Sequence, residues 1–120
     1  CDATKPYEIL KSNGEKATFD CISSWEVIEH IHPDHLDQFF INICNHMKPT
    51  SIFIGSISLV NDFHDGNGEF EKKVDLHQAV YTKETWCNEI LNKYFKVNEY
   101  IFKNKTRNES TSFEVTLIKL

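Results

Sequence analysis

The stretch FDCISSWEVIEHIHPDHLDQFFINICNHMKPTSIFIGSISL, residues 19–59, decides the fold of this chain. Residues 19–24 form a short apolar run, which predicts a buried strand. From 36 to 47 the apolar side chains recur at spacings of three and four, which predicts an amphipathic helix with Pro33 in its first turn. The apolar, β-branched run 51–60 predicts a second buried strand. Strand, helix and strand in this order indicate a parallel β-α-β unit.

The rest of the chain continues the alternation of predicted strands and helices. Thr82 is suited to cap a second helix over 83–94, and two alternating segments, 97–102 and 112–120, predict strands. We expect the first two strands to be parallel, 112–120 to lie antiparallel beside the second, and 97–102 to lie at the outside edge. The expected fold class is α/β: a single domain over residues 1–120 whose parallel strands end in an antiparallel hairpin.

Composition narrows the function classes. The 120 residues are 40% hydrophobic, which suffices for one core, and the net charge of −5 is mild. Lys and Arg form no block, so we expect no nucleic-acid partner. The sequence holds no apolar run of the roughly 18 residues that a membrane span needs, so we expect no membrane partner either. Cys21 and Cys44 lie in apolar segments, where buried, reduced thiols are usual, and this favours a cytoplasmic protein.

Carboxylates and imidazoles gather just after the first predicted strand. Glu26 and Glu29 are three residues apart, and His30 follows directly. In α/β sheets, ligands bind beyond the carboxyl ends of the parallel strands, which is where this cluster lies. From the residues alone, the cluster fits a metal site, an acid/base pair or a solvated helix start. His32 and His35 we interpret as solvated residues at the start of the helix.

The same residues resemble the class I S-adenosylmethionine-dependent methyltransferases. In that family a strand that begins F-D is followed by E-V-I/L-E-H-I/V, a helix with paired aromatic residues, L-K-P-G-G and another apolar strand. The matching positions, in order and spacing, are Phe19-Asp20, 26–31, Phe39-Phe40 and Lys48-Pro49, and the opening Cys-Asp-Ala-Thr is similar to the family's acidic residue after its third strand. The resemblance covers nearly the whole chain and implies a Rossmann-like methyltransferase fold.

The sequence departs from the family pattern at two places. Thr50-Ser51 stands where G-G is usual, which we expect to change only a turn. The family's glycine-rich loop after its first strand has no counterpart, because Gly66-Asn67-Gly68, the one G-x-G here, lies in the polar loop after 51–60. We therefore expect a partial fold, the C-terminal part of a methyltransferase domain, whose first strand, glycine loop and second strand would lie before residue 1.

The resemblance implies S-adenosylmethionine as the cofactor. Asp2 would accept a hydrogen bond from the adenine amino group, and the Ala3 N–H would donate to a ring nitrogen; alternatively, Asp2 only caps a turn. The exit of the first strand would approach the methionine portion, where Trp25 either packs on the ligand or closes the edge of the core. The expected cofactor-binding residues are Asp2, Ala3, Ser23, Ser24, Trp25 and Glu26.

For the E-x-x-E-H cluster the resemblance leaves two possibilities. Some relatives, the ubiquinone-pathway and small-RNA O-methyltransferases, use this motif to hold a divalent metal, and the small-RNA enzymes need further histidines downstream, for which His64 and His77 are the candidates here. In most relatives the Glu and His side chains hydrogen-bond to neighbouring loops. We favour the second interpretation and predict no metal.

His77 is the candidate catalytic residue, as a general base on an acceptor hydroxyl or amine. The alternative is a loop histidine that hydrogen-bonds to the backbone. Gln78 and Tyr81 could orient a small polar acceptor. In-line methyl transfer depends mainly on proximity and alignment, so little acid/base help is needed.

The predicted function is S-adenosylmethionine-dependent methyl transfer to a small-molecule acceptor. The alternative is a non-catalytic fragment that packs against a partner chain. A partial fold would leave one edge of the first strand bare, so we also expect a homo-oligomer that forms through the exposed sheet edge. Without the glycine loop, we expect the 120-residue chain to bind the cofactor weakly or not at all.

Overall fold

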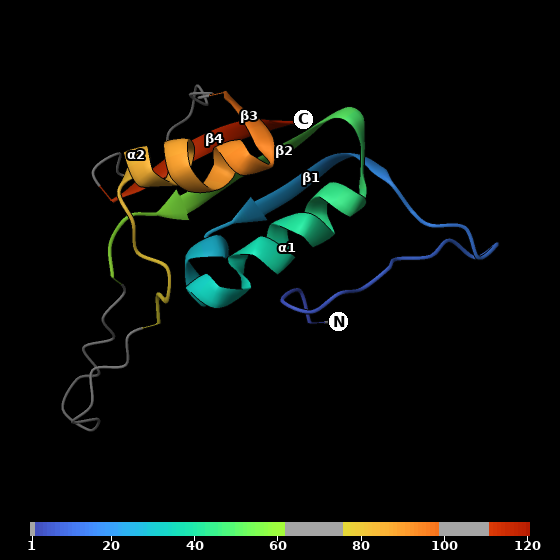
Figure 1. The fold of residues 1–120 in the computed structure, drawn as a ribbon, viewed down its shortest axis with the longest axis horizontal. Helices are drawn as coiled ribbons and strands as arrows, with labels where there is room; N and C mark the ends of the chain where they lie inside the picture. The colour runs from blue at the N-terminus through green and yellow to red at the C-terminus, as the bar shows by residue number, and fades with distance from the viewer. Residues whose placement is uncertain (1, 62–75, 99–110) are drawn as a thin grey trace.

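The computed structural model describes residues 2–61, 76–98 and 111–120, and it contains one four-stranded sheet (Figure 1). The strand order is β1-β2-β4-β3. The strands are β1 Phe19–Trp25, β2 Met47–Ser58, β3 Phe95–Asn98 and β4 Ser112–Lys119. β1 is parallel to β2, β4 is antiparallel to β2, and β3 pairs with the outer side of β4. The predicted strand arrangement is therefore confirmed, although residues 99–102 of the last predicted edge strand lie outside the described residues.

The helix between the two parallel strands is α1, Pro33–Asn45. Pro33 occupies its first turn, and the ring of His32 caps it by accepting a hydrogen bond from the Asp34 N–H at 3.2 Å. A short 3₁₀ turn, η1 (Ile28–His30), connects β1 to this helix. The sequence placed the second strand at 51–60, but β2 begins four residues earlier, at Met47. Lys48 and Pro49 thus lie inside β2, at an irregularity where the register with β1 shifts between Met47 and Ile52 and Thr50 has φ +62°.

The second helical segment is irregular. It consists of α2 (Lys83–Thr85), a π-helical turn η2 (Trp86–Ile90) and a 3₁₀ turn η3 (Leu91–Lys93). Thr82 caps it as predicted, by accepting a hydrogen bond from the Thr85 N–H at 3.2 Å. Burial of Trp86 and Leu91 anchors the segment to the sheet. Within the described part of the chain, no helix is both long and apolar enough to cross a membrane.

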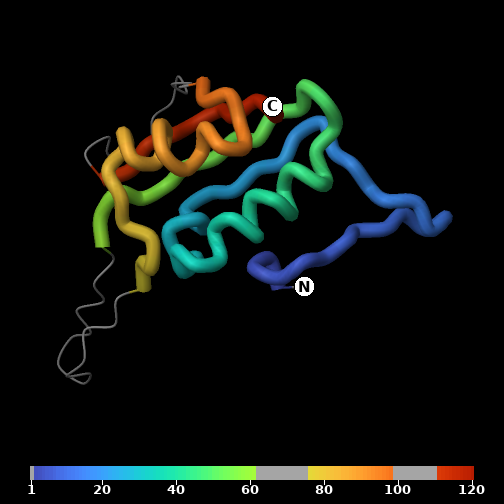
Figure 2. The backbone as a smooth tube through the Cα atoms, in the orientation of Figure 1, coloured from blue at the N-terminus to red at the C-terminus, as the bar shows by residue number. Residues whose placement is uncertain are grey.

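α1 and the second helical segment cover the same face of the sheet (Figures 1 and 2). The core lies between them and β2 and β4, and its largest fully buried side chains include Trp86, Phe40, Phe53, Phe95 and Leu117. Cys21 is exposed and not buried as the sequence suggested, because it lies on β1 at the edge of the sheet. Cys44 is half-buried, and neither cysteine is in a disulfide with another described residue.

Gly55 sets how closely β1 and β2 approach. It pairs with Ser24 in the parallel register, and a Cβ atom at position 55 would lie 2.0 Å from the Ser24 carbonyl oxygen. That separation is far below van der Waals contact, and the colliding atom belongs to the backbone, so no side-chain rotation can relieve it. The pairing of the two parallel strands therefore requires a glycine at this position.

We predict that Gly55→Ala lowers the free energy of unfolding by about 3 kcal/mol or more, because the added methyl group pushes β1 away from β2. The control is Gly14→Ala: Gly14 has φ +84°, but a methyl group there would meet no atom within 4 Å, so only left-handed backbone strain of about 1 kcal/mol is expected. Urea denaturation of both variants measures the difference. Equal losses would show that the close approach at Gly55 carries no special cost.

Candidate functional site

The chain makes a strained turn where β1 ends. Glu26 has φ +52°, in the left-handed region that side chains other than glycine rarely adopt. Its N–H donates to the Ser56 carbonyl at 3.1 Å, which ties the turn to the neighbouring strand. Strained backbone of this kind is costly and is often found at binding sites. The turn brings η1 directly onto the carboxyl edge of the sheet.

Backbone hydrogen bonds then join η1 to residues 76–79. The Glu29 carbonyl accepts from the N–H groups of Gln78 and Ala79, at 2.8 and 2.9 Å. The Nδ1 atom of His30 donates to the Leu76 carbonyl at 2.9 Å. Two stretches almost fifty residues apart in sequence therefore lie side by side, as the start of the helical region and the segment before α2 do in Figure 1.

Three ionisable side chains meet at this junction. Glu29 is fully buried, His77 is buried and His30 is exposed. One ligand atom from each lies within 4.8 Å of the others, and the two imidazole rings meet edge to face with their centroids 4.6 Å apart. A cavity of about 290 Å³ opens beside them; its lining residues are Glu26, Glu29, His30, Ser58, Val60, Asn61, His77, Thr111 and Ser112.

Burial raises the pKa of Glu29 to about 7, from an ordinary value of 4.5. A hydrogen bond between its protonated form and Glu26, together with the charge of Glu26, raises the pKa further, whereas positive charge on His77 lowers it. Neither carboxylate oxygen of Glu29 has another hydrogen-bond partner within the described residues. Near neutral pH this carboxyl group is therefore able both to hold and to release a proton.

This pKa predicts how stability depends on pH in the metal-free protein. Glu29 ionises in the unfolded chain near pH 4.5 but stays protonated in the folded chain until about pH 7, so its contribution to the free energy of unfolding falls between these values. We expect Glu29→Gln to remove that fall, so that the variant gains on the order of 2 kcal/mol relative to wild type between pH 4 and pH 8.

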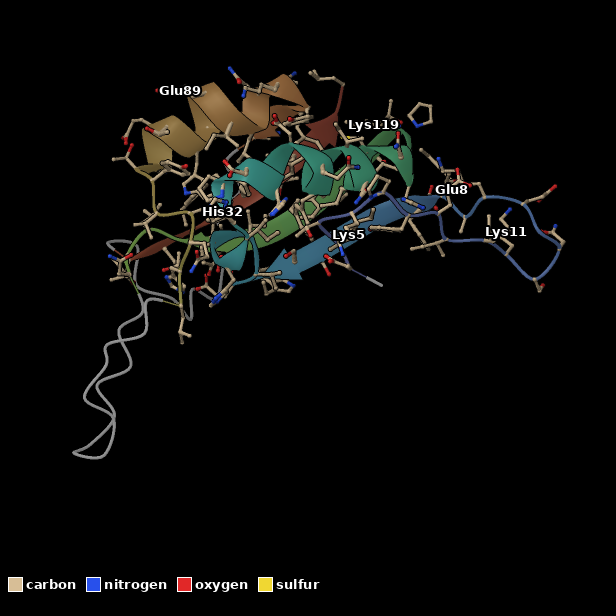
Figure 3. All side chains as sticks on the ribbon, turned by 60° about the horizontal axis from the view of Figure 1, so that its bottom comes forward. Lys5, Glu8, Lys11, His32, Glu89 and Lys119 are labelled. Atoms are coloured by element: carbon tan, nitrogen blue, oxygen red, sulfur yellow. The ribbon has the colours of Figure 1, made fainter. Side chains whose placement is uncertain are left out.

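The measurement is urea denaturation at both pH values in the presence of a chelator. Glu89→Gln serves as the control, because Glu89 is an exposed carboxylate on the second helical segment (Figure 3). The free energy of unfolding of this control should change with pH as that of wild type does. If the free energy of unfolding of Glu29→Gln also follows wild type, the Glu29 carboxyl group ionises in the folded protein as it does in water.

Asp2 and Ala3, expected at the adenine, lie in a segment that binds to α1. The Asp2 carboxylate accepts hydrogen bonds from the Thr4 N–H and hydroxyl, at 2.9 and 2.6 Å, and these bonds lower its pKa. This is the turn cap that the sequence left open as the alternative. The Ala3 carbonyl accepts from the Asn42 side chain at 2.9 Å. Binding of adenine by the exposed Asp2 and by Ala3 stays a prediction.

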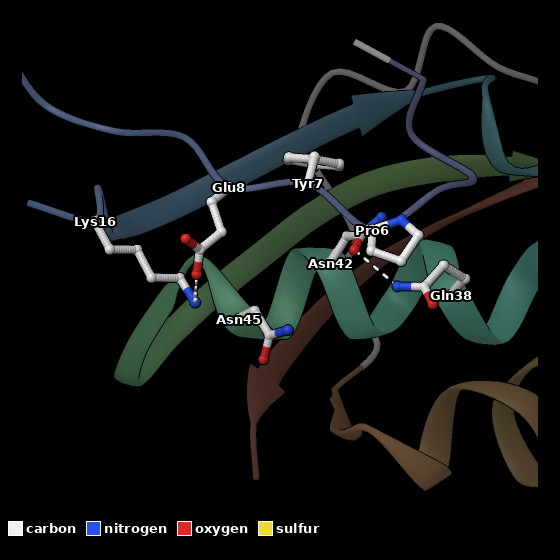
Figure 4. A pocket seen from close by; sticks show the side chains of 7 residues that line it. All are labelled: Pro6, Tyr7, Glu8, Lys16, Gln38, Asn42 and Asn45. Carbon is white, nitrogen blue, oxygen red and sulfur yellow. Dashed lines mark hydrogen bonds and ion pairs between the residues drawn. The ribbon is translucent and has the colours of Figure 1, made fainter. Parts of the chain in front are cut away.

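The clamp between this segment and α1 is a feature that the sequence analysis missed. His46 is buried, donates through Nδ1 to the Asn42 carbonyl at 2.7 Å, and accepts from the Ile9 N–H at 2.9 Å. The ring of Tyr7 stacks on it at 5.1 Å. Beside the clamp lies an open hollow of about 410 Å³ (Figure 4), lined by Pro6, Tyr7, Glu8, Lys16, Gln38, Asn42 and Asn45. The sequence showed only which positions of the helix are apolar. His46 follows these positions and belongs to no recognisable motif, so its contacts with the N-terminal segment could not be predicted.

The exit of β1 carries three of the residues that were expected to bind the cofactor. Ser23 and Trp25 are exposed, the Trp25 side chain to 41%. The Ser24 hydroxyl is buried and has no hydrogen-bond partner within the described residues. An exposed indole and a hydroxyl without a partner at the carboxyl end of a parallel strand fit a ligand with an apolar portion and polar groups. That they contact the methionine side of S-adenosylmethionine stays a prediction.

Of the remaining candidate residues that the structure describes, only His77 lines the cavity. His32 and His35 are exposed at the start of α1, as predicted, and Figure 3 shows His32 there. His77 donates through Nδ1 to the Val60 carbonyl, so it is hydrogen-bonded to the backbone, yet it also lines the cavity. Gln78 is exposed, and the Tyr81 ring packs edge-on against Trp86. His64 lies outside the described residues.

Comparison with solved structures identifies the fold. The whole chain superposes on 57% of the PH0226 protein from Pyrococcus horikoshii OT3, with a TM-score of 0.65 and 19% sequence identity. It likewise covers 63% of a S-adenosylmethionine-dependent methyltransferase from Clostridium acetobutylicum ATCC 824, with a TM-score of 0.59 and 18% identity. No protein-family model and no curated protein matches the sequence.

The fold is therefore the Rossmann-like fold of class I methyltransferases, as the sequence resemblance implied, and it is a part of that fold. The chain spans about six tenths of the length of these two structures. At such low identity the likeness concerns the fold alone. The chemistry rests on the site residues of this chain.

Proposed function

We propose that this chain takes part in S-adenosylmethionine-dependent methyl transfer to a small-molecule acceptor. The observation that carries the proposal is the site at the carboxyl edge of β1 and β2, where buried Glu29 and His77 line a cavity and the exposed Trp25 ends β1, one residue before the cavity-lining Glu26. Ligands of open α/β sheets bind at this edge. The fold likeness to a methyltransferase adds support.

The residues have separate roles in this proposal. The cofactor supplies an electrophilic methyl group, and Ser23, Ser24 and Trp25 would contact its methionine side. Ser58 and Ser112, which line the cavity, can hydrogen-bond to an acceptor hydroxyl or amine. Because Nδ1 of His77 donates to a carbonyl, its Nε2 carries a lone pair that can take the proton of that acceptor.

The binding part of the proposal is tested by titrating S-adenosylhomocysteine into ¹⁵N-labelled protein and following amide resonances. We expect the changes to centre on residues 23–26, with a dissociation constant in the millimolar range or weaker. Starting from micromolar cofactor affinity, near −8 kcal/mol, loss of the glycine loop's charge-assisted contacts removes roughly 1.5–3 kcal/mol and its shape complementarity more.

Trp25→Leu should weaken this binding at least about tenfold, since it removes the aromatic wall. Phe19→Leu is the matched control, because Phe19 is 40% exposed at the opposite end of the same strand, close to the 41% of Trp25. If both variants bind as wild type does, or if the resonance changes centre on another edge of the sheet, the ligand site is not at the exit of β1. Micromolar binding would instead show that the chain carries a complete site.

The bare edge of β1 favours a second candidate function, a non-catalytic module that associates with another chain. Within the described residues β1 pairs with β2 alone, so its outer edge presents backbone N–H and C=O groups. Phe19 and Trp25 are exposed along it. We propose that a second copy of the chain covers this edge by antiparallel pairing of β1 with β1.

Analytical ultracentrifugation tests the association. We expect wild type to form a dimer at high concentration and Cys21→Lys to shift it towards monomer, because a charge on the edge strand opposes pairing. Asn98→Lys places the same charge on the other edge strand, β3, and should leave the dimer intact. A monomeric wild-type protein at all concentrations, or equal effects of both substitutions, would rule out pairing through β1.

A further inference from the structure

We infer that the cavity beside Glu29 binds a protonated amine, so that the methyl acceptor of the proposed reaction is a small amine or the amine end of a larger molecule. The inference rests on the proposed function for the methyl transfer, but binding of the amine depends on this chain alone. Three observations carry it: the spacing of three acceptor atoms, the charge and hydrogen-bonding character of the cavity lining, and the burial of a carboxyl group.

Three hydrogen-bond acceptors converge at the cavity. One carboxylate oxygen of Glu29 and one ring nitrogen each of His30 and His77 lie within 4.8 Å of one another. Around an ammonium nitrogen with hydrogen bonds of about 2.9 Å, acceptors at tetrahedral angles lie about 4.7 Å apart. The spacing in this chain therefore suits one R–NH₃⁺ group that donates a hydrogen bond to each of the three side chains.

Backbone hydrogen bonds make both histidines acceptors towards a ligand. Nδ1 of His30 faces the Leu76 carbonyl, and Nδ1 of His77 faces the Val60 carbonyl. Because a carbonyl oxygen can only accept, each Nδ1 carries the ring proton, and each neutral ring keeps a lone pair on Nε2. The two rings are thus oriented by the backbone and still have one acceptor atom each for a bound N–H group.

The cavity lining favours a cation over an anion. Among the described residues that line it, Glu26 and Glu29 are acidic and none is lysine or arginine. The Ser58 hydroxyl donates to the Thr111 carbonyl at 3.3 Å, which leaves its oxygen as a further acceptor. A carboxylate or phosphate can only accept and would face like charge here. An alkylammonium group can only donate, so it is complementary to this lining.

The Glu29 carboxyl group is an independent sign of a ligand. Its side chain is fully buried, and apart from Glu26 neither of its oxygens has a hydrogen-bond partner among the described residues. Burial and the neighbouring Glu26 raise its pKa to about 7, because the ionised form lacks a compensating positive charge. An ammonium group would supply both that charge and an N–H donor. Of the three converging side chains His30 is the exposed one, so the amine would enter along its ring.

A neutral hydroxyl group is the competing acceptor for the methyl group. It has one O–H donor, whereas an alkylammonium has three N–H donors for the three converging acceptors. Buried polar groups that stay unpaired are unfavourable, so the amine satisfies the site more completely. The cavity volume of about 290 Å³ is at the lower end for small-molecule sites, which is why the ligand is small or only its amine end is bound.

In the proposed reaction, the ammonium group first loses one proton to Nε2 of His77, which leaves a lone pair on its nitrogen. This nitrogen bonds to the methyl carbon while the bond from that carbon to the cofactor's sulfur breaks. The electron pair of the broken bond stays on sulfur, and the product is a methylated ammonium ion. The ionised Glu29 offsets the positive charge on the product and on His77.

The test compares three probes of similar size and different charge: butylammonium, 1-butanol and butyrate. Each is titrated into the ¹⁵N-labelled 120-residue protein at pH 8 and constant ionic strength, with a chelator present and no cofactor. We expect butylammonium to bind at least about tenfold more tightly than 1-butanol, because a charge-assisted hydrogen bond replaces a neutral one. Butyrate should not bind, and the amide resonance changes should centre on Glu29 and His77.

Glu29→Gln keeps the shape of the side chain and removes its charge. It should bring the affinity for butylammonium to within about twofold of that for 1-butanol, and unchanged 1-butanol binding would show that the cavity is intact. Glu89→Gln removes the same charge from an exposed position and should leave the preference for the amine as in wild type. His30→Phe keeps a ring at an exposed position but removes its lone pair, so it should lower the preference several-fold.

Equal binding of butylammonium and 1-butanol by the wild-type protein, or no binding of butylammonium, would overturn the inference. An unchanged preference for the amine in both Glu29→Gln and His30→Phe, or resonance changes centred away from the cavity, would overturn it as well. Because no assay uses S-adenosylmethionine, failure here leaves methyl transfer to a neutral acceptor standing. Amine binding without binding of S-adenosylhomocysteine would leave the amine site standing and count against the proposed methyl transfer.

Discussion

The parallel pairing of β1 with β2 is the constraint on which the other features of this structure depend. It requires Gly55 opposite Ser24, because any Cβ at position 55 would collide with the Ser24 carbonyl. Two parallel neighbours need a crossover, and α1 supplies it on one face of the sheet. Their carboxyl ends meet at one edge, so the turn at Glu26 and the end of β2 come together there. Without this pairing neither the core under α1 nor the cavity at the sheet edge would form.

The candidate site is assembled mainly by backbone hydrogen bonds. The Glu29 carbonyl accepts two N–H groups from the segment after residue 75, and each histidine of the cluster donates to a carbonyl. Such bonds hold side chains in place without consuming their remaining donor atoms. As a result, Glu29, His30 and His77 are positioned and yet available to a ligand. This combination distinguishes them from the exposed histidines at the start of α1, which lie nearby in sequence.

Local patterns made much of the fold predictable. Spacings of three and four located α1, continuous apolar runs located β1 and β2, and alternation located β3 and β4, whose order in the sheet is confirmed. The patterns failed where tertiary contacts compete with them. β2 starts at Met47 and not at residue 51, because Met47 already pairs with Phe19, but regular pairing with β1 begins only at Ile52 after a shift in register. Cys21, in an apolar run, is exposed because β1 lies at the edge.

Part of the candidate site could be predicted from the sequence. The E-x-x-E-H motif and its position after a strand were recognised there, and His77 was named as the candidate catalytic residue. The sequence by itself determined the element types, their order, and the chemical groups available at the carboxyl edge, because these follow from local periodicity and residue identity. Only the tertiary structure decided that His77 meets Glu29 and His30, that Glu29 is buried beside Glu26, and that His46 anchors the N-terminal segment. These are contacts between residues distant in sequence, and no local pattern encodes which of several histidines will meet a given carboxylate.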